Sequence, residues 1–391
     1  MQPPTITDGK RRQLLARRHL LTPSARTDDV VAIARSLVAL HSTDPVSVYL
    51  SVLARMRNPD LVAVAEALYG DRSLIRHHAM RRTLWVAPPE TICVMHRACT
   101  RKIAAVERRK TEAFLAASGV GDPGPWLEDA QEQVCRVLAE HGPVSAREIG
   151  VLLPAVARPL ALSTGKSYAG VQGAHSRVVT GLGFEGVAVR TKPSGTWING
   201  QYAWARMQDW APALHTSMQS GEVQQAQGEL ARMWLARFGP GTERDLSWWS
   251  GWTLGDTRAA LTACGAEPMT IDTGQGWALP ADGASSSESD HGAADAEPWV
   301  ALLPGLDPSI MGWKERGFAV PVGGEAAWDT NGNAGPTVWV DGQVVGAWGQ
   351  TKTGEIRLHY FVDVPAARRR HVQARADEVR AWLGETRISW R

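Results

Sequence analysis

Four polar residues, His41, Ser42, Thr43 and Asp44, stand side by side directly before Pro45. Histidine has a pKa near working pH, so a neutral imidazole can accept a proton from water. The Thr43 hydroxyl, two residues along, could hold the same water molecule. The segment therefore contains groups suited to hydrolysis, although a lone histidine more often only completes the hydrogen bonds of a turn.

Asp44 adds a carboxylate to this segment, but its position has a structural explanation. Aspartate followed by proline is typical of a helix start, with Asp44 as the N-cap and Pro45 as the first helical residue. We therefore expect Asp44 to cap a helix that ends near Arg55. The apolar positions from residue 27 to Leu40 predict another helix, which has acidic residues near its start.

A short phrase occurs twice, as Gly-Pro-Val-Ser-Ala-Arg-Glu-Ile at 142–149 and as Gly-Pro-Gly-Thr-Glu-Arg-Asp-Leu at 239–246. Proline lacks the amide hydrogen and ends the preceding helix. Ser145 or Thr242 then caps the next helix, and the acidic residue three positions later completes a capping box. Each copy predicts a helix–turn–helix. With the segment around His41 there are three such units, and they point to DNA binding.

The chain as a whole fits three tandem winged-helix units, so we predict a fold class that is mainly α with small β-wings. The predicted boundaries are 1–122 for unit 1, 123–220 for unit 2, and 221–391 for unit 3 with a β-rich extension and a C-terminal helix. The wing of unit 1 is expected between 73 and 86, and that of unit 2 from strands at 187–191 and 196–203. In unit 3, Asp341-Gly342 predicts a tight hairpin.

Charge is unevenly distributed along the chain. Residues 1–118 hold 19 Lys and Arg against 10 Asp and Glu, while the remainder holds 23 against 30. A basic first third beside an acidic remainder predicts phosphate contacts in that third, or alternatively only a well-solvated helical surface.

Composition argues against several other classes of protein. The cysteines at 93, 99, 135 and 264 lack metal-ligand spacing, so we expect buried thiols, no metal and no disulfide framework. No apolar run approaches the roughly 18–20 residues that cross a bilayer, and no signal-peptide pattern opens the chain. We expect a cytoplasmic protein with no membrane partner. The stretch 281–297 is rich in Ser, Ala, Gly and acids, and is expected to be a loop.

Four motifs in series resemble those of the AlkZ/YcaQ-type DNA glycosylases, which are bacterial proteins built from tandem winged helices. The matching segments are, in chain order, 37–45, 75–85, 238–251 and 302–316. Each motif alone has little specificity, but the four occur in the family's order and cover nearly the whole chain.

The resemblance implies a C-shaped protein whose concave, basic surface holds duplex DNA. It also implies hydrolysis of the N-glycosidic bond of alkylated purines, including bulky genotoxin adducts for some members, with no metal or other cofactor. An N7-alkylated purine already carries positive charge and leaves readily, so the deoxyribose develops oxocarbenium character. The enzyme must then place and deprotonate one water below the sugar and support the developing cation.

The first motif departs from the family pattern, which carries Gln-x-Gln or Gln-x-Asp where this chain has His41 and Thr43. We expect these two as the catalytic residues, with His41 as the base or the group that positions water and Thr43 as its partner. Two alternatives stay open. In the first, the replacement of the family residues by His41 and Thr43 abolishes catalysis and leaves a DNA-binding protein. In the second, His41 only completes the hydrogen bonds of a turn.

The other motifs supply candidate DNA-binding residues, namely Arg76, Arg81, Arg82, Trp85, Asp307 and Arg316. In the second motif Arg82 replaces a family glycine and Trp85 a family histidine, which suggests a pocket fitted to a different lesion. Asp307 and Arg316 match family positions and could line the cleft, although a structural ion pair would explain them equally well.

The predicted function is a monofunctional DNA glycosylase of base excision repair, since no positioned lysine or terminal amine for a Schiff-base lyase is evident. We expect it to act on N7-alkylated purines in duplex DNA, as a nucleoid-associated monomer, in self-resistance to a DNA-alkylating antibiotic. The alternative is a non-enzymatic winged-helix regulator or lesion sensor. Three units in one chain argue against a regulator that dimerises on a two-fold operator.

Overall fold

The computed structural model describes residues 3–162, 170–280 and 297–389, and shows a helix-rich α+β protein. This class agrees with the sequence prediction. The predicted loop 281–297 lies outside the described residues except for Glu297, whose carboxylate accepts hydrogen bonds from Ser24.

The first third carries the segment with His41. Its elements are β1 (Thr5–Ile6), α1 (Asp8–Arg18), α2 (Val30–Ser36), β2 (Leu40–His41), α3 (Pro45–Leu53), α4 (Leu61–Ala65), β3 (Ile75–His78), β4 (Leu84–Ala87), α5 (Pro89–Met95) and α6 (Arg101–Ala117). Asp44 caps α3 as predicted, because its carboxylate accepts the Val46 amide at 3.0 Å. The preceding helix is shorter than predicted. It starts after Asp29, which accepts the Ala32 amide at 2.9 Å, and it ends before Leu40 enters a strand.

The middle of the chain follows a similar order. Its elements are α7 (Pro123–His141), β5 (Val144–Ser145), α8 (Ala146–Leu152), β6 (Pro159–Leu162), β7 (Gly170–Gly173), α9 (Ala174–Glu185), β8 (Ala188–Pro193), β9 (Tyr202–Arg206), α10 (Met207–Trp210) and α11 (Pro212–Met218). The strand predicted at 196–203 is wrong for 196–201. Those residues form a turn, in which the Asn199 side chain donates to the carbonyl of Ser194 at 2.6 Å. We name residues 194–201 the β8–β9 loop.

The last part begins with α12 (Val223–Phe238), α13 (Glu243–Ser250), α14 (Leu254–Ala263), β10 (Glu267–Ile271) and β11 (Gly274–Ala278). It continues with β12 (Val300–Leu303), α16 (Pro308–Met311), β13 (Thr337–Val340), β14 (Gln343–Gln350), β15 (Ile356–Tyr360) and α17 (Ala366–Leu383). The last four strands form one antiparallel sheet in the order β12-β13-β14-β15. The predicted hairpin is confirmed, since Asp341 and Gly342 connect β13 to β14 with φ of 47° and 88°.

One arrangement of helices and strands recurs along the chain. Sheets β2-β4-β3 and β5-β9-β8 have the same order, with a short first strand beside the second strand of a hairpin. In the third occurrence Gly241 pairs with Trp277 of β11, and β1 adds to the other edge of the hairpin. Both Gly-Pro phrases start a helix with a capping box, on Ser145 and on Thr242, as predicted.

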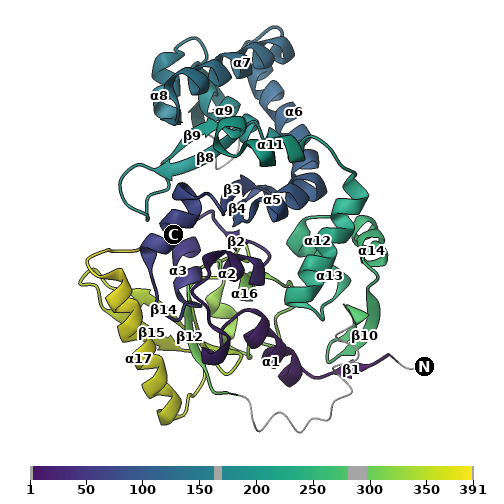
Figure 1. Cartoon of the computed structure of the whole chain (residues 1–391), viewed down its shortest axis with the longest axis vertical. Coiled ribbons are helices and arrows are strands. Elements are labelled where there is room, and N and C mark those ends of the chain that lie inside the picture. The colour runs from purple at the N-terminus through teal and green to yellow at the C-terminus, as the bar shows by residue number, and fades with distance from the viewer. Residues whose placement is uncertain (1–2, 163–169, 281–296, 390–391) are drawn as a thin grey trace.

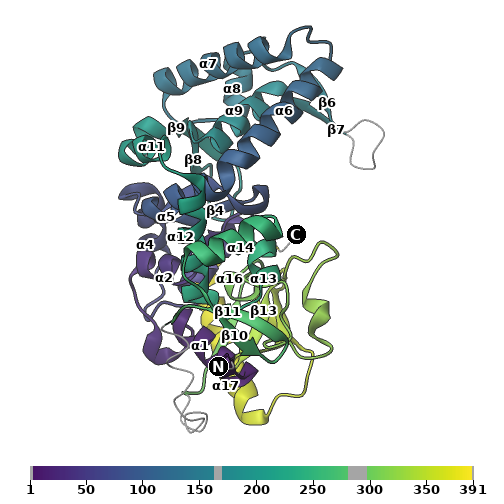
Figure 2. The ribbon, with the colours of Figure 1, turned by 90° about the vertical axis from the view of Figure 1, so that its right-hand side faces the viewer.

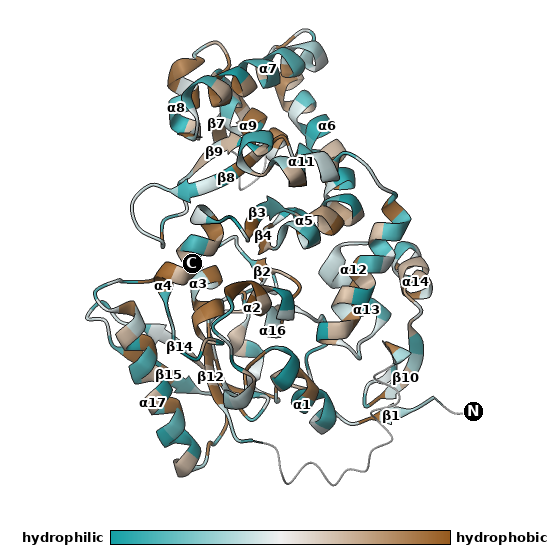
Figure 3. Ribbon diagram, viewed as in Figure 1, coloured by the Kyte–Doolittle hydropathy of each residue, from teal (hydrophilic) through white to brown (hydrophobic). Residues whose placement is uncertain are grey.

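The molecule is elongated, with α7 to α9 at one end of its long axis and α1 and α17 at the other (Figures 1 and 2). Figure 3 shows α3 and β12 as mostly hydrophobic, and every residue of α3 is buried. Indole rings fill much of the core, including Trp234, Trp249 and Trp339 at 1% exposure or less. No described helix is long and apolar enough to span a membrane.

The cysteines are free thiols. Those at 93, 99 and 264 are buried, as predicted, and Cys135 is partly exposed. Among the described residues, no three His, Cys, Asp or Glu side chains converge as a metal site would require.

Candidate active site

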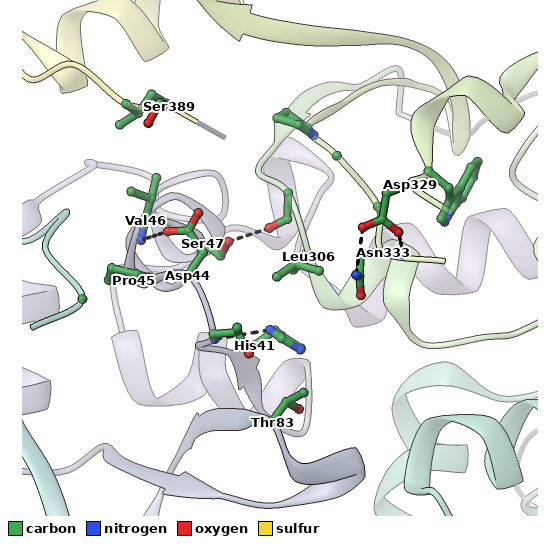
Figure 4. A pocket seen from close by; sticks show the side chains of 18 of the residues that line it. His41, Asp44, Pro45, Val46, Ser47, Thr83, Leu306, Asp329, Asn333 and Ser389 are labelled. Carbon is green, nitrogen blue, oxygen red and sulfur yellow. Dashed lines mark hydrogen bonds between the residues drawn. The ribbon is translucent and has the colours of Figure 1, made fainter. Parts of the chain in front are cut away.

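A pocket of about 890 Å³ lies where three parts of the chain meet. One wall is formed by His41 and residues 43–47, with Thr83 beside it (Figure 4). Arg81 also lines the pocket. A second wall comes from Ile198 and Gly200 of the β8–β9 loop. The third comes from residues 305–306, 326–329, 333–336 and 387–389. This volume is within the range of small-molecule sites, and it is large enough for a purine that carries an adduct.

His41 reaches the pocket from strand β2, which pairs with β4. The residue lies opposite Trp85 in this ladder, and its imidazole packs edge-on against the indole with 4.8 Å between ring centroids. Only 4% of His41 is exposed, yet the residue lines the pocket. The strand and the indole therefore fix the ring in the wall.

Burial determines the protonation state of His41. Burial, together with a smaller effect of the positive charge of Arg81, lowers the pKa of the imidazole to about 3. The ring is therefore neutral at pH 7. Its Nδ1 accepts the Thr43 amide at 3.5 Å, which leaves the ring hydrogen on Nε2. In this state His41 is a weak base that can orient water by donating a hydrogen bond.

Thr43 and Asp44 follow His41 along the same wall. Thr43 is exposed and lines the pocket, so its hydroxyl is accessible to a water or a sugar. Asp44 lines the pocket while it caps α3, so capping does not remove it from the site. The Ser47 hydroxyl donates to the Gly305 carbonyl at 2.6 Å and joins this wall to the third wall.

Two arginines and two indoles stack at the pocket rim. The guanidinium of Arg81 lies 4.1 Å from the ring centroid of Trp248, and that of Arg316 lies 4.9 Å from Trp248 and 5.0 Å from Trp328. Burial and the charge of Arg81 lower the pKa of Arg316 to about 10, so it stays cationic at pH 7. Neither arginine forms an ion pair with a carboxylate of the described chain.

The second Gly-Pro phrase positions this stack. Asp245, the capping-box residue of α13, also accepts the backbone amides of Lys314 at 2.9 Å and Glu315 at 2.8 Å, which brings the next residue, Arg316, beside α13. At the other end of α13, Gly251 has a φ of 77°, and a Cβ there would lie 3.3 Å from Arg81 Cγ. A glycine at this position permits both the turn and the close approach.

Three of the predicted DNA-binding residues are buried in the structure. Trp85 is 1% exposed and belongs to the core behind His41. Asp307 is fully buried, 2.8 Å from Arg55 in an ion pair, so the structural alternative holds for it. Arg76 is 3% exposed and donates to Ser42 and Tyr69. Direct contact with DNA needs exposed atoms, and these side chains have almost none.

The other three predicted residues have accessible surface. Arg81 lines the pocket and Arg316 stacks beside it, as described above. Arg82 points away from the core and pairs with Glu107 at 3.0 Å, with 55% of its side chain exposed. Contact of Arg81, Arg82 and Arg316 with DNA stays a prediction.

Sequence reasoning missed several residues of the site. Trp248 is not among the site residues predicted from the sequence, yet it is only half-buried and both guanidinium groups stack on its ring. Trp328 and the segment 326–336 line the pocket without any motif to mark them. The available signal was the pair Trp248-Trp249, because neighbouring helix residues face different directions and only one can enter the core.

Comparisons with known proteins are consistent with this architecture. A search of curated proteins found no match. The structure is similar to that of Streptomyces sahachiroi DNA glycosylase AlkZ, with a TM-score of 0.73 and 19% identity over 99% of each chain. That likeness shows the fold. The family model described as DNA glycosylase AlkZ-like matches residues 34–382. The chain therefore belongs to the AlkZ-like DNA glycosylase family.

Proposed function

We propose that this protein is a monofunctional DNA glycosylase that hydrolyses the N-glycosidic bond of N7-alkylated purines in duplex DNA. The observation that carries the proposal is the pocket itself. It places the His41 imidazole and the Thr43 hydroxyl on one wall, beside Arg81, which forms no ion pair with a described carboxylate. Membership of a DNA glycosylase family supports the same reaction.

The reaction needs little acid catalysis from the protein. A water oxygen bonds to C1′ of the deoxyribose, the bond from C1′ to the purine N9 breaks, and its electron pair leaves with the base. The base departs uncharged because alkylation had made it cationic, and the proton of the attacking water passes to solvent. His41 and Thr43 would position this water by hydrogen bonds. His41 would not deprotonate it, because the lowered pKa of the imidazole makes the ring a poor proton acceptor.

Recognition of DNA would fall to the partly exposed arginines at the rim. Arg81 and Arg316 would contact the backbone near the lesion, with Arg82 farther out, and such contacts make affinity depend on salt. The three recurring arrangements of helices and strands are interpreted as winged-helix units arranged in a C-shape around the duplex. Three DNA-contacting units in one chain would allow it to act as a monomer.

The pocket volume supports an extension to bulky adducts, of the kind formed by DNA-alkylating antibiotics. Trp85, which packs against His41, replaces the histidine that the family pattern carries, so the support behind the His41 ring is altered. A bulky adduct exposed in a groove would not require complete extrusion of the nucleotide. We propose self-resistance to such an agent as the biological role.

The direct test is incubation of the protein with a duplex that carries a single N7-alkylguanine, followed by alkali. Strand cleavage at the resulting abasic site is the expected result, while cleavage before alkali would contradict monofunctional action. The weak basicity of His41 favours one alternative, a lesion sensor that binds without cutting. Tight binding with no cleavage for several adducts would establish that alternative.

A further inference from the structure

We propose that Arg76 is a positioning residue for the reaction. Its guanidinium links Ser42, and with it the flanking His41 and Thr43, to Tyr202, the residue that follows the β8–β9 loop. The second wall of the pocket would thereby set the geometry of the first. This inference rests on the proposed function and adds a role to a residue that sequence reasoning had assigned to DNA.

The contacts of Arg76 lead directly to the His41 segment. Its Nε donates to the Ser42 hydroxyl at 2.8 Å, and its Nη1 donates to the Tyr69 hydroxyl at 3.1 Å. Ser42 itself is fully buried, and its amide donates to the Leu84 carbonyl at 2.8 Å. Ser42 is therefore fixed by hydrogen bonds through both its side chain and its backbone. Its position determines where the adjacent residues His41 and Thr43 lie in the pocket wall.

The other face of the guanidinium contacts the second third of the chain. Arg76 Cζ lies 4.3 Å from the ring centroid of Tyr202, the first residue of β9. Two residues earlier Gly200 lines the pocket, and Trp197 of the same loop packs on Tyr49 of α3 with 5.0 Å between ring centroids. A substrate that contacts the β8–β9 loop from the pocket would therefore shift Tyr202. Through Arg76, the same shift would reach Ser42.

The environment of Arg76 is costly for a residue that serves packing alone. It forms no ion pair with any described carboxylate, and its Nη2 is buried without a hydrogen-bond partner among those residues. A buried charge without a counter-charge destabilises a protein, and an apolar side chain of similar size would avoid that penalty. We infer that the arginine is retained because of what it holds in place.

The chain provides a matched control for this contact. Arg72 joins the same two parts of the molecule, with its Cζ 4.0 Å from the ring centroid of Trp210 and its Nη1 donating to the Trp210 carbonyl at 3.0 Å. Its Nε is also buried without a described partner. None of its described contacts reaches residues 41–43. Arg72→Gln therefore disturbs the junction without releasing Ser42.

The experiment measures single-turnover release of N7-methylguanine, DNA affinity and thermal unfolding for each variant. We expect Arg76→Gln and Ser42→Ala each to slow release about 30-fold, with affinity within about threefold, and the double variant to be no slower than either alone within about threefold. Tyr202→Phe should be within about twofold of the wild type because the Tyr202 hydroxyl has no described partner. Arg72→Gln should also be within about twofold.

A second readout does not depend on activity. Backbone hydrogen exchange in a peptide that covers residues 40–48 should become faster in Arg76→Gln and in Ser42→Ala, but not in Arg72→Gln. If the wild type releases no base, the proposed function fails while the exchange measurement still tests the positioning role. Equal slowing in the Arg72 and Arg76 variants, or unchanged exchange in both, would overturn the inference. Ser42→Ala removes one hydroxyl, so it tests the idea even if Arg76→Gln fails to fold.

Discussion

The His41 imidazole meets the Trp85 indole edge-on, 4.8 Å between centroids, across the β2–β4 ladder. The indole covers one side of the imidazole and excludes water from that side, while the residue still lines the pocket. The pair accounts for two properties together, a fixed ring orientation and a pKa lowered to about 3.

Replacement of His41 tests its role directly. We expect His41→Ala to abolish base release while DNA affinity changes by less than about tenfold, roughly 1.4 kcal/mol. His41→Gln restores the residue of the family pattern, and it should keep measurable release because an amide also donates a hydrogen bond to water. His359→Ala alters an exposed histidine of β15 and is the control. Normal release by His41→Ala would remove this residue from the mechanism.

The pH profile distinguishes a water-positioning histidine from a titrating base. Because the pKa of His41 is lowered to about 3, its ring stays neutral from about pH 5 upward. Single-turnover release should therefore be flat between about pH 5.5 and 8.5. An inflection near the ordinary histidine value of about 6.5 would show a titrating base and contradict the assignment.

Buried histidines make stability depend on pH. Burial lowers the pKa of His78 to about 3, and the charge of Arg190 acts in the same direction. The unfolded chain binds the proton below about pH 6.5 and the folded chain does not, so this stabilisation is complete above that pH and is lost as pH falls toward 3. From pH 6.5 to 5 the loss is at most about 2 kcal/mol per such histidine. Denaturant unfolding of His78→Phe should show a smaller decline over that interval.

The rim arginines should govern salt-dependent binding. Arg81→Ala and Arg316→Ala should each weaken affinity for undamaged and damaged duplex alike, and reduce the slope of log affinity against log salt by about 1. Arg35→Ala serves as the control. Arg35 is exposed, and its guanidinium forms an ion pair with the Glu90 carboxylate at 2.6 Å. Unaltered slopes for both rim variants would show that neither arginine reaches a phosphate.

The buried ion pair of Arg55 and Asp307 should be a stability element. Its partners are 2.8 Å apart and fully buried, and Asp307 also accepts the Ser51 hydroxyl at 2.6 Å. Arg55→Met leaves a buried carboxylate without its counter-charge, so we expect a loss of about 3–5 kcal/mol in the free energy of unfolding. Chemical denaturation measures it. A loss below about 1 kcal/mol would mean that the pair is replaceable.

Local signals in the sequence predicted much of the fold. The capping boxes at Ser145 and Thr242, the cap at Asp44 and the turn at Asp341-Gly342 each depend on residues within a few positions of one another. The strand predicted at 196–203 is wrong over residues 196–201, because Gly195, Asn199 and Gly200 favour turns more than the alternating apolar pattern favours a strand.

The remaining geometry of the site depends on contacts between residues that are far apart in the sequence. Arg55 and Asp307 are 252 positions apart, and no spacing rule relates them. Whether Arg76 meets DNA or Ser42 depends on how β3 packs against β8 and β9, which sequence periodicity does not encode. The stack of Arg81, Trp248 and Arg316 likewise exists only after three distant segments come together.

The pocket draws its walls from positions as far apart as 41 and 389. A ribosome delivers the earlier of these long before the later, so a nascent or prematurely terminated polypeptide carries His41 without the surfaces that enclose it. On the proposed function, base removal would require a polypeptide synthesised at least as far as residue 389. The genome would then be spared stray abasic sites made by partial translation products.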